Sequence, residues 1–255
     1  MPKVKKIKRL RGGVVVYAAQ ANVQIDAEIG EKGRFRMETN YVVTSNHIHL
    51  LVIDDGPKVI PSSLQLIAGR TAQEFNQRKK RKGAFWEDRY HATAVERNEH
   101  LIRCLVYIDL NMVRAGVVTH PSEWEMCGYN EIQNPPKRYG VIDVPGLRDL
   151  CGFSDPGEFA KQHRQWVQTA ISDGKHQRES CWTQSIAVGG VGFIEEIKAR
   201  LGIKGMGRRI EEQESDRCVL REESEPYSAA FDPKKERLSS DNSYFLDVLF
   251  TDSIG

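Results

Sequence analysis

An apolar run over residues 41–53 carries two histidines, His47 and His49, and constrains the fold more strongly than any other stretch of the chain. Its β-branched and aliphatic residues predict one extended strand, in which successive side chains alternate between two faces. His47 and His49 then point to one side, while Ile48 and Leu50 anchor the other side in a core. Two imidazoles on one side of a rigid strand can hold a divalent ion. Taken alone, such a pair is more often simply a partly buried polar pair.

The segments around this strand alternate between strand and helix patterns. Residues 22–39 are charged and interrupted by glycines, so they allow at most one or two helical turns. Ser62 or Ser63 is the expected N-cap of an amphipathic helix, and Gly116 is expected to close a later one. The order predicts an α+β fold, with an antiparallel sheet and helices packed on one of its faces. Strands are expected at 14–19, 41–53 and near 90–95, and helices from 62 or 63 into 78–82 and from 99 to 115.

The pattern changes in the second half of the chain, which predicts a division into four parts. Residues 1–12 form a basic arm, residues 13–134 the main α+β domain, residues 141–210 a mostly helical C-terminal region, and residues 211–255 a charged tail. Prolines and basic residues at 135–138 are typical of a linker. Within the tail, residues 244–250 fit either a closing strand or a disordered segment.

Clustered positive charge says more about partners than the net charge of +2 does. A second basic cluster, after that of the arm at residues 1–12, follows the first predicted helix at residues 78–82. Clusters of this kind suit contacts with phosphates, although a solvated loop is the commoner explanation of a single run. The basic residues of the arm are Lys3, Lys5, Lys6, Lys8, Arg9 and Arg11.

Cysteine use and hydropathy indicate a protein of the cytoplasm. The five cysteines are scattered and form no C-x-x-C pair, which argues against a disulfide framework or a zinc ribbon and for a reducing compartment. No run of eighteen apolar residues exists, and the basic N-terminus is not followed by the apolar core of a signal peptide. We therefore expect neither a membrane span nor export.

Two polar residues of the helix at 99–115 complete a candidate site. Tyr107 and Asn111 are four residues apart and share one helical face. Facing a strand with two histidines, they would supply a nucleophile and an oxygen ligand for the same metal ion. Alone, Tyr107 fits a core aromatic residue and Asn111 a solvent-facing or capping residue; the pairing with His47 and His49 favours the site.

Three segments resemble the signature blocks of a known enzyme family. They are residues 46–52 (NHIHLLV), 85–90 (FWEDRY) and 107–118 (YIDLNMVRAGVV). Together they are similar to the REP-associated tyrosine transposases, which belong to the single-tyrosine HUH transposases of insertion-sequence elements (the IS200-like family). The blocks occur in family order over roughly residues 40–130, about half of the chain. The second half carries no such block.

The resemblance implies a ferredoxin-like or RRM-like HUH domain and a specific chemistry. His47, His49 and Asn111 would bind Mg²⁺ or Mn²⁺ as cofactor, and Tyr107 would attack single-stranded DNA and form a 5′-phosphotyrosine. The implied partner is single-stranded DNA or a DNA hairpin of a repetitive palindromic element. The resemblance also allows the enzyme to be a homodimer. Residues expected to contact DNA are Lys79, Lys80, Arg81, Trp86, Arg89 and Arg114; for Trp86, an ordinary core position is an equal alternative.

Two departures from the family pattern keep other functions open. Met112 stands where the family usually has proline, a mild change, and residues 22–39 are too short and glycine-rich for the helix expected there. A first alternative is therefore a catalytically decayed protein that binds DNA hairpins without turnover. A second is a metal-dependent hydrolase in which His47 and His49 activate water, although no further ligand completes a hydrolase pattern.

Overall fold

The computed structural model describes residues 13–18, 39–45, 47–53, 59–86, 90–97, 99–138, 140–174, 177–213 and 217–222. Four predictions lie outside the described residues: the basic arm at 1–12, the short segment at 22–38, the contact residue Arg89, and the tail beyond residue 222. None of the described helices is both long and apolar enough to cross a membrane.

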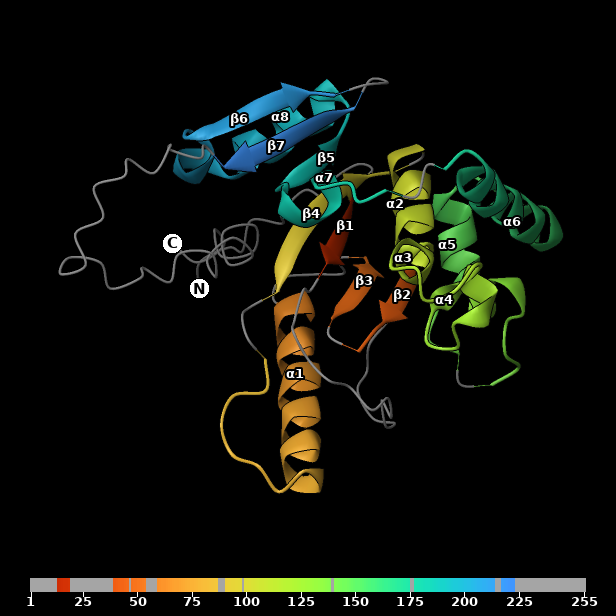
Figure 1. Cartoon of the computed structure of the whole chain (residues 1–255). Coiled ribbons are helices and arrows are strands. Elements are labelled where there is room, and N and C mark those ends of the chain that lie inside the picture. The colour runs from red at the N-terminus through yellow and green to blue at the C-terminus, as the bar shows by residue number, and fades with distance from the viewer. Residues whose placement is uncertain are drawn as a thin grey trace, which may run out of the picture.

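A single mixed sheet forms the centre of the described structure (Figure 1). Its strand order is β2-β3-β1-β4-β5-β7-β6, and every pairing is antiparallel except that of β4 with β5. The predicted strands at 14–19 and 90–95 are confirmed as β1 and β4, which pair with each other along their whole length. The strands are β1 (Gly13–Ala18), β2 (Asn40–Val43), β3 (Ile48–Val52), β4 (His91–Glu96), β5 (Ala187–Gly189), β6 (Arg208–Glu212) and β7 (Cys218–Glu222).

The predicted single strand over residues 41–53 is wrong, because this segment folds into the β2–β3 hairpin. Val43 pairs with Ile48 and Val42 with His49. The turn between them is held at Thr44, whose backbone N–H and side-chain hydroxyl both donate to the carbonyl of His47, at 2.9 and 2.8 Å. Threonine, serine and asparagine hydrogen-bond to nearby backbone and so favour turns, which is the signal that the apolar flanks concealed.

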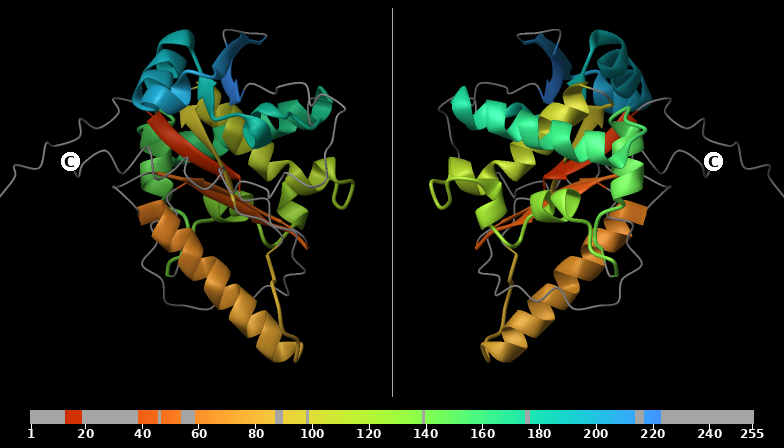
Figure 2. Two further views of the ribbon diagram at one scale, coloured as in Figure 1. Left: turned by 90° about the vertical axis from the view of Figure 1, so that its left-hand side faces the viewer. Right: turned by 90° about the vertical axis from the view of Figure 1, so that its right-hand side faces the viewer.

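Helices cover both faces of the sheet, so the prediction of helices on one face is also wrong (Figure 2). Every residue of β3 is buried, and alternate residues enter two separate cores. Leu51 packs with α2 (Glu99–Asp109) in the first core, whereas Ile48 and Leu50 pack with residues of α1 (Val59–Arg78) and α8 (Val191–Arg200) in the second. A strand buried on both faces needs a covering layer on each side.

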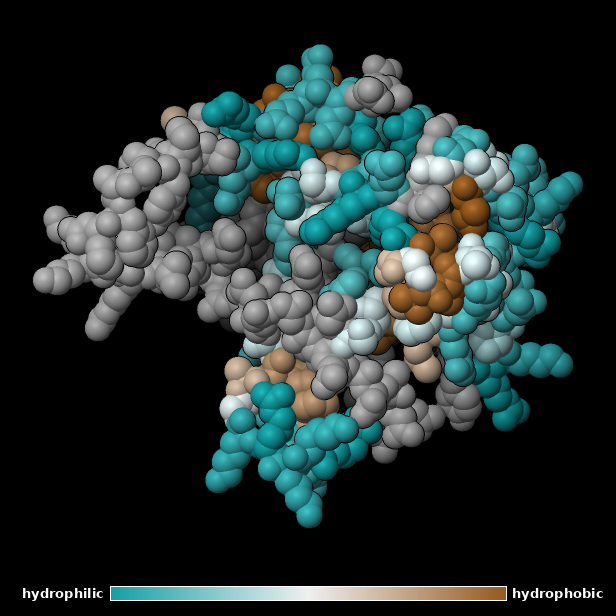
Figure 3. All heavy atoms as spheres, viewed as in Figure 1, coloured by the Kyte–Doolittle hydropathy of each residue, from teal (hydrophilic) through white to brown (hydrophobic). Residues whose placement is uncertain are grey.

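Helix α1 begins at Val59, three residues before the predicted N-cap at Ser62 or Ser63. Pro61 lies within its first turn, where a missing N–H costs nothing because that group has no partner inside the helix. The helix projects from the body of the molecule, and its C-terminal end, which leads into the basic cluster, is hydrophilic (Figures 1 and 3).

The helix predicted from Glu99 to Ala115 is confirmed in position but divided in two. Helix α2 ends at Asp109, and α3 (Asn111–Arg114) follows after Leu110. The Leu110 N–H still donates to the carbonyl of Val106, and the Arg114 N–H donates to the carbonyl of Leu110. Gly116 has a φ of 69° and ends this unit as predicted, in a conformation that suits glycine.

The C-terminal region, which was predicted to be mostly helical, also contains three strands that the sequence did not indicate. Strand β5 pairs in parallel with β4, with Ala187 opposite Ala94, and the β6–β7 hairpin extends the sheet from there. Residues 211–222, predicted as part of a charged tail, therefore contribute to the sheet. The remaining elements are η1 (Pro121–Glu123), α4 (Gly128–Gln133), α5 (Val144–Leu150), α6 (Pro156–Ser172), α7 (Cys181–Gln184) and η2 (Gly202–Gly205).

Candidate active site

The two histidines of the hairpin lie side by side. His47 is the last residue of the turn and is half-buried, whereas His49 is in β3 with only 5% of its surface exposed. Their ring centroids are 4.8 Å apart and the rings are nearly perpendicular, at 81°. The turn thus brings the two imidazoles together, although they do not belong to one continuous strand.

Tyr107 and Asn111 meet these histidines from the α2–α3 unit. The ring centroid of Tyr107 lies 6.4 Å from that of His49, and Asn111 Nδ2 is 3.3 Å from His47 Nε2. Although α2 ends at Asp109 and α3 begins at Asn111, both side chains face the histidines. Two pairs of residues, about sixty positions apart in sequence, therefore form one cluster.

Arg114 holds a positive charge against the tyrosine. Its Cζ atom lies 3.9 Å from the centroid of the Tyr107 ring, and its Nη2 donates to the Tyr107 carbonyl at 3.0 Å. A guanidinium over an aromatic face is attracted by the ring, and its remaining N–H groups can bind phosphate oxygens. Arg114 can therefore both orient Tyr107 and stabilise negative charge beside it.

The histidine pKa values are lowered, so both rings are neutral near pH 7. The pKa of His49 is lowered to about 3, first by burial and then by the adjacent His47 and two arginines. Burial also lowers the pKa of His47, against a hydrogen bond with Asn111 that raises it. The arginines acting on both rings are Arg114 and Arg178. Neutral imidazole is the form that binds metal ions.

The pKa of Tyr107 is raised above its usual value, chiefly because burial disfavours the phenolate. The positive charges of Arg114 and Arg178 act in the opposite direction and lower it. Tyr107 has 7% of its surface exposed and is therefore a protonated phenol at neutral pH, held where nearby cations favour its ionised form.

The donor set of this cluster fits a divalent metal ion. The Nδ1 atom of His49 is buried and has no hydrogen-bond partner among the described residues, so a lone pair there can bind an ion. Asn111 faces His47, and its amide oxygen and nitrogen can exchange places by a flip, which would turn oxygen toward the ion. Within the described ranges, no group of three or more imidazole, thiol or carboxylate side chains could hold a metal. A metal ion at this position would therefore need the Asn111 amide beside the two imidazoles.

Two residues of the C-terminal region that the sequence did not indicate act on this cluster. Trp182, in α7, is buried with its ring centroid 6.1 Å from that of Tyr107. Arg178 is exposed, and its charge acts on His47, His49 and Tyr107. Both lie about seventy residues after Tyr107, outside the family blocks, so no spacing pattern connects them to the site.

The predicted DNA-contacting cluster at Lys79, Lys80 and Arg81 is exposed at the end of α1 that points away from α2, the helix that bears Tyr107 (Figure 1). Arg81 is oriented by a contact with the Phe75 ring, at 5.5 Å, and by donation to the Ala84 carbonyl at 2.8 Å. These cations present a separate surface from the histidine and tyrosine cluster, so they can bind only a more distant part of a ligand.

Trp86 connects the loop that follows α1 to the helix itself. Its Nε1 donates to the Ala68 carbonyl at 2.8 Å, and its ring packs edge-on against Phe85. The side chain is half-buried, so this position has both a packing role and an accessible part.

Comparison with known families adds an independent observation about this part of the chain. Residues 18–111 match the family described as "Transposase IS200 like". The matched region includes His47, His49, Tyr107 and Asn111, and it ends before Arg114. It supports a transposase-type function acting on DNA and does not separate the REP-associated subtype from other IS200-like transposases. No curated protein and no solved structure matches the chain.

Proposed function

We propose that this chain cleaves and rejoins single-stranded DNA through a covalent intermediate on Tyr107. The main support for this proposal is that two neutral imidazoles, an amide and a tyrosine of the IS200-like region face one another. The arginine against the tyrosine supplies positive charge where a phosphate would sit. Similarity to the family and geometry of the site thus favour the same chemistry.

In the proposed step, the Tyr107 Oη attacks the phosphorus of a phosphodiester. A bond forms between Oη and phosphorus, and the bond from phosphorus to the 3′-oxygen breaks. The phenol loses its proton, the leaving oxygen takes one up as a 3′-hydroxyl, and the 5′-phosphate stays on Tyr107. A second DNA 3′-hydroxyl can reverse the step and join the strands without another energy source.

His47, His49 and Asn111 are the residues that would hold Mg²⁺ or Mn²⁺ at this site. When bound, the ion would neutralise charge on the non-bridging phosphate oxygens. Low pKa values keep the two imidazoles unprotonated and available over the physiological range.

Tyrosine suits this reaction because phenolate leaves more readily than an alkoxide, so the covalent intermediate stays reversible. Burial raises the pKa of Tyr107 and works against ionisation. Arg114 and Arg178 lower that pKa, and Arg114, which lies over the Tyr107 ring, is placed to stabilise the phenolate and the phosphate that replaces it.

The proposed substrate is a single strand or hairpin, of the kind found in repetitive palindromic elements. The exposed cations Lys79, Lys80 and Arg81 would bind phosphates away from the cleaved bond. The accessible part of Trp86 would stack on an unpaired base, a contact worth about 1–3 kcal/mol. The proposed reaction involves no membrane. It is compatible with a homodimer.

A labelled single-stranded hairpin incubated with Mn²⁺ tests the proposal. We expect a covalent protein–DNA adduct with the unaltered chain and none with Tyr107→Phe. Tyr41→Phe is the matched control, because Tyr41 is a half-buried tyrosine of β2 without a role in the cluster, and its adduct yield should be unchanged. Cleavage that survives Tyr107→Phe would instead identify a hydrolase that uses water.

The exposed basic end of α1 also favours a second candidate, a protein that binds DNA hairpins without turnover. It predicts no adduct from either protein and equal hairpin affinity for the unaltered chain and Tyr107→Phe. The same experiment therefore separates the two functions.

A further inference from the structure

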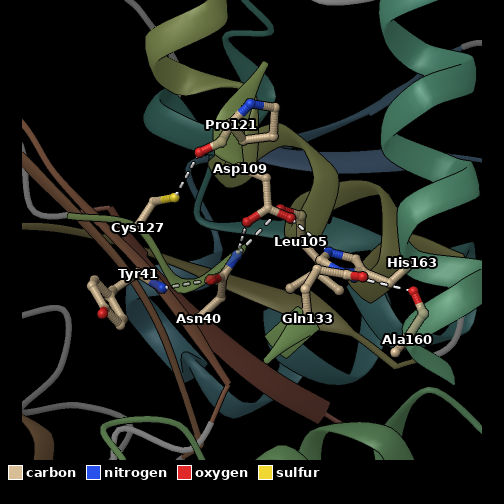
Figure 4. A network of polar contacts seen from close by, with 9 residues as sticks. All are labelled: Asn40, Tyr41, Leu105, Asp109, Pro121, Cys127, Gln133, Ala160 and His163. Carbon is tan, nitrogen blue, oxygen red and sulfur yellow. Dashed lines mark hydrogen bonds and ion pairs between the residues drawn. The ribbon is translucent and has the colours of Figure 1, made fainter. Parts of the chain in front are cut away.

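Asp109, a buried carboxylate, lies between Tyr107 and Asn111 in the sequence of the α2–α3 unit. Asp109 is 1% exposed and follows Tyr107 by two positions, so it projects about 200° away around the helix. Its Oδ1 accepts from Asn40 Nδ2 at 2.9 Å, and its Oδ2 contacts His163 Nε2 at 2.7 Å (Figure 4). The back of the helix that bears Tyr107 is thus fixed by one hydrogen-bonded anion.

The neighbours of His163 determine which of its nitrogens carries the proton. Arg164 can only donate, and its Nη2 donates to Gln133 Oε1 at 2.9 Å, which fixes the orientation of that amide. Gln133 Nε2 then donates to the Ala160 carbonyl at 3.1 Å and to His163 Nδ1 at 2.9 Å (Figure 4). With Nδ1 accepting, Nε2–H donates to Asp109.

Asn40 connects the same carboxylate to the hairpin that carries the histidines. It is the first residue of β2, pairs with Leu51 of β3, and accepts from the Tyr41 N–H at 2.8 Å. A Cβ atom on Gly128 would lie only 2.0 Å from Asn40 Oδ1, so the glycine makes room for this amide. Asp109 therefore joins the hairpin, α2 and α6 at one point.

We propose that His163, acting through Asp109, is a positioning residue for Tyr107 and Asn111. The inference rests on the proposed function and adds a role for the C-terminal region: α6 sets where the end of α2 lies relative to His47 and His49. The His163 ring is fully buried, and both of its nitrogens have partners, so the link is rigid. Displacement of a catalytic group by about 1 Å can cost about 10²-fold in rate.

The test compares His163→Leu, which removes the donor, with His163→Gln, whose side-chain amide can still donate to Asp109. Val167→Ala is the control, since Val167 is equally buried in α6 and contacts the same core without joining the network. Adduct formation in a single turnover and hairpin affinity are measured on the whole chain. We expect His163→Leu to slow adduct formation by about 10–100-fold with affinity within about twofold, and His163→Gln and Val167→Ala to stay within about threefold.

Equal rate losses in His163→Leu and Val167→Ala, or no loss in His163→Leu, would overturn the positioning role. If His163→Leu does not fold, Gln133→Met replaces it, because it removes the donor that holds the ring while keeping a similar shape. A rate within about twofold of the unaltered chain for Gln133→Met would then contradict the proposal, and a loss of about threefold or more would support it.

A second readout separates this inference from the proposed function. The chain is labelled with 3-fluorotyrosine, and the Tyr107 fluorine resonance is assigned by its loss in Tyr107→Phe. We expect the resonance to shift or broaden in His163→Leu, or in Gln133→Met, and to be unchanged in Val167→Ala. If no protein forms an adduct, the proposed function fails, yet this resonance still decides the positioning role: an unchanged resonance in the network variants overturns it.

Discussion

Two histidine environments lie on different sides of α2, and their hydrogen bonding differs. On one side, His49 Nδ1 is buried without a partner among the described residues, and burial holds the pKa of His49 at about 3. On the other, both nitrogens of His163 are engaged, one by Gln133 and one by Asp109. Burial alone therefore does not identify a histidine that can bind a ligand. A buried imidazole with an unused lone pair is available to a ligand, whereas one with two partners stabilises the fold.

The largest effect on stability is expected on the fully bonded side. His163→Leu leaves the Asp109 carboxylate buried with one hydrogen bond fewer, and losing a buried hydrogen bond to a charged group costs about 1.5–3 kcal/mol. Urea unfolding followed by circular dichroism measures the loss. His49→Leu is the comparison, and we expect it to change the free energy of unfolding by much less. Equal losses in the two variants would remove the distinction between the environments.

The largest effect on activity is expected on the other side. His49→Ala removes a proposed metal ligand, and we expect adduct formation to fall by about 10²-fold or more, since Lewis-acid stabilisation is worth several kcal/mol. Mn²⁺ titration by calorimetry should show weakened binding in the same variant. His91→Ala, which alters a histidine of β4 outside the cluster, is the control. Undiminished Mn²⁺ affinity in His49→Ala would exclude this site as the metal centre.

The pH dependence of stability should reveal the His49 ring directly. Its pKa is lower in the folded chain than in the unfolded chain, so the unfolded state binds more protons below about pH 6.5. Its contribution therefore makes the folded state less stable as pH falls, by about 1.4 kcal/mol per pH unit. In unfolding experiments at pH 7, 6 and 5 in chelator-treated buffer, the free energy of unfolding of His49→Gln should fall less steeply with falling pH than that of the unaltered chain. Parallel curves for both proteins would mean that His49 is not a buried neutral ring.

A smaller effect is expected from the cation against the nucleophile. Arg114→Met removes a positive charge that lowers the pKa of Tyr107, so that pKa should rise further. We expect the rate of adduct formation to fall by about tenfold, the value of one charge-assisted contact, and its pH profile to move toward higher pH. An unmoved profile would show that Arg114 acts only in packing.

The smallest effect is expected at the end of α1. Replacing Lys79, Lys80 and Arg81 with alanine should weaken hairpin binding mainly at low salt and reduce the salt slope by about 0.7 for each lost phosphate contact. The rate of adduct formation at saturating DNA should stay the same, because this cluster lies at the end of α1 that points away from α2. A reduced saturated rate would place the cluster nearer the reaction than the structure does.

Local spacing predicted that the candidate residues lie close together. The two histidines do lie side by side, although in a turn and the following strand rather than in the predicted single strand, and Tyr107 and Asn111 both face them. The strands β1 and β4 and the helices α5, α6 and α8 could also be predicted, because each carries its own pattern or cap. These features depend on neighbours within a few residues.

Features that depend on distant contacts could not be predicted. The hairpin turn at Thr44 is hidden in an apolar run, and the short strand β5 carries too few residues to show a period. Asp109 and His163 are separated by 54 residues, and Trp182 follows Tyr107 by an even longer interval. Only packing of the C-terminal region brings His163 and Trp182 to α2, and no spacing in the sequence indicates these contacts.

Tyr107 is the residue that we expect to form the covalent bond with DNA. Trypsin should cut after Arg103 and Arg114 and release residues 104–114, in which Tyr107 is the only tyrosine. Mass spectrometry of the Mn²⁺-dependent adduct should find a nucleotide attached to this peptide, and only when the chain carries Tyr107. Adduct mass on any other peptide, or no adduct from the unaltered chain, would contradict the account.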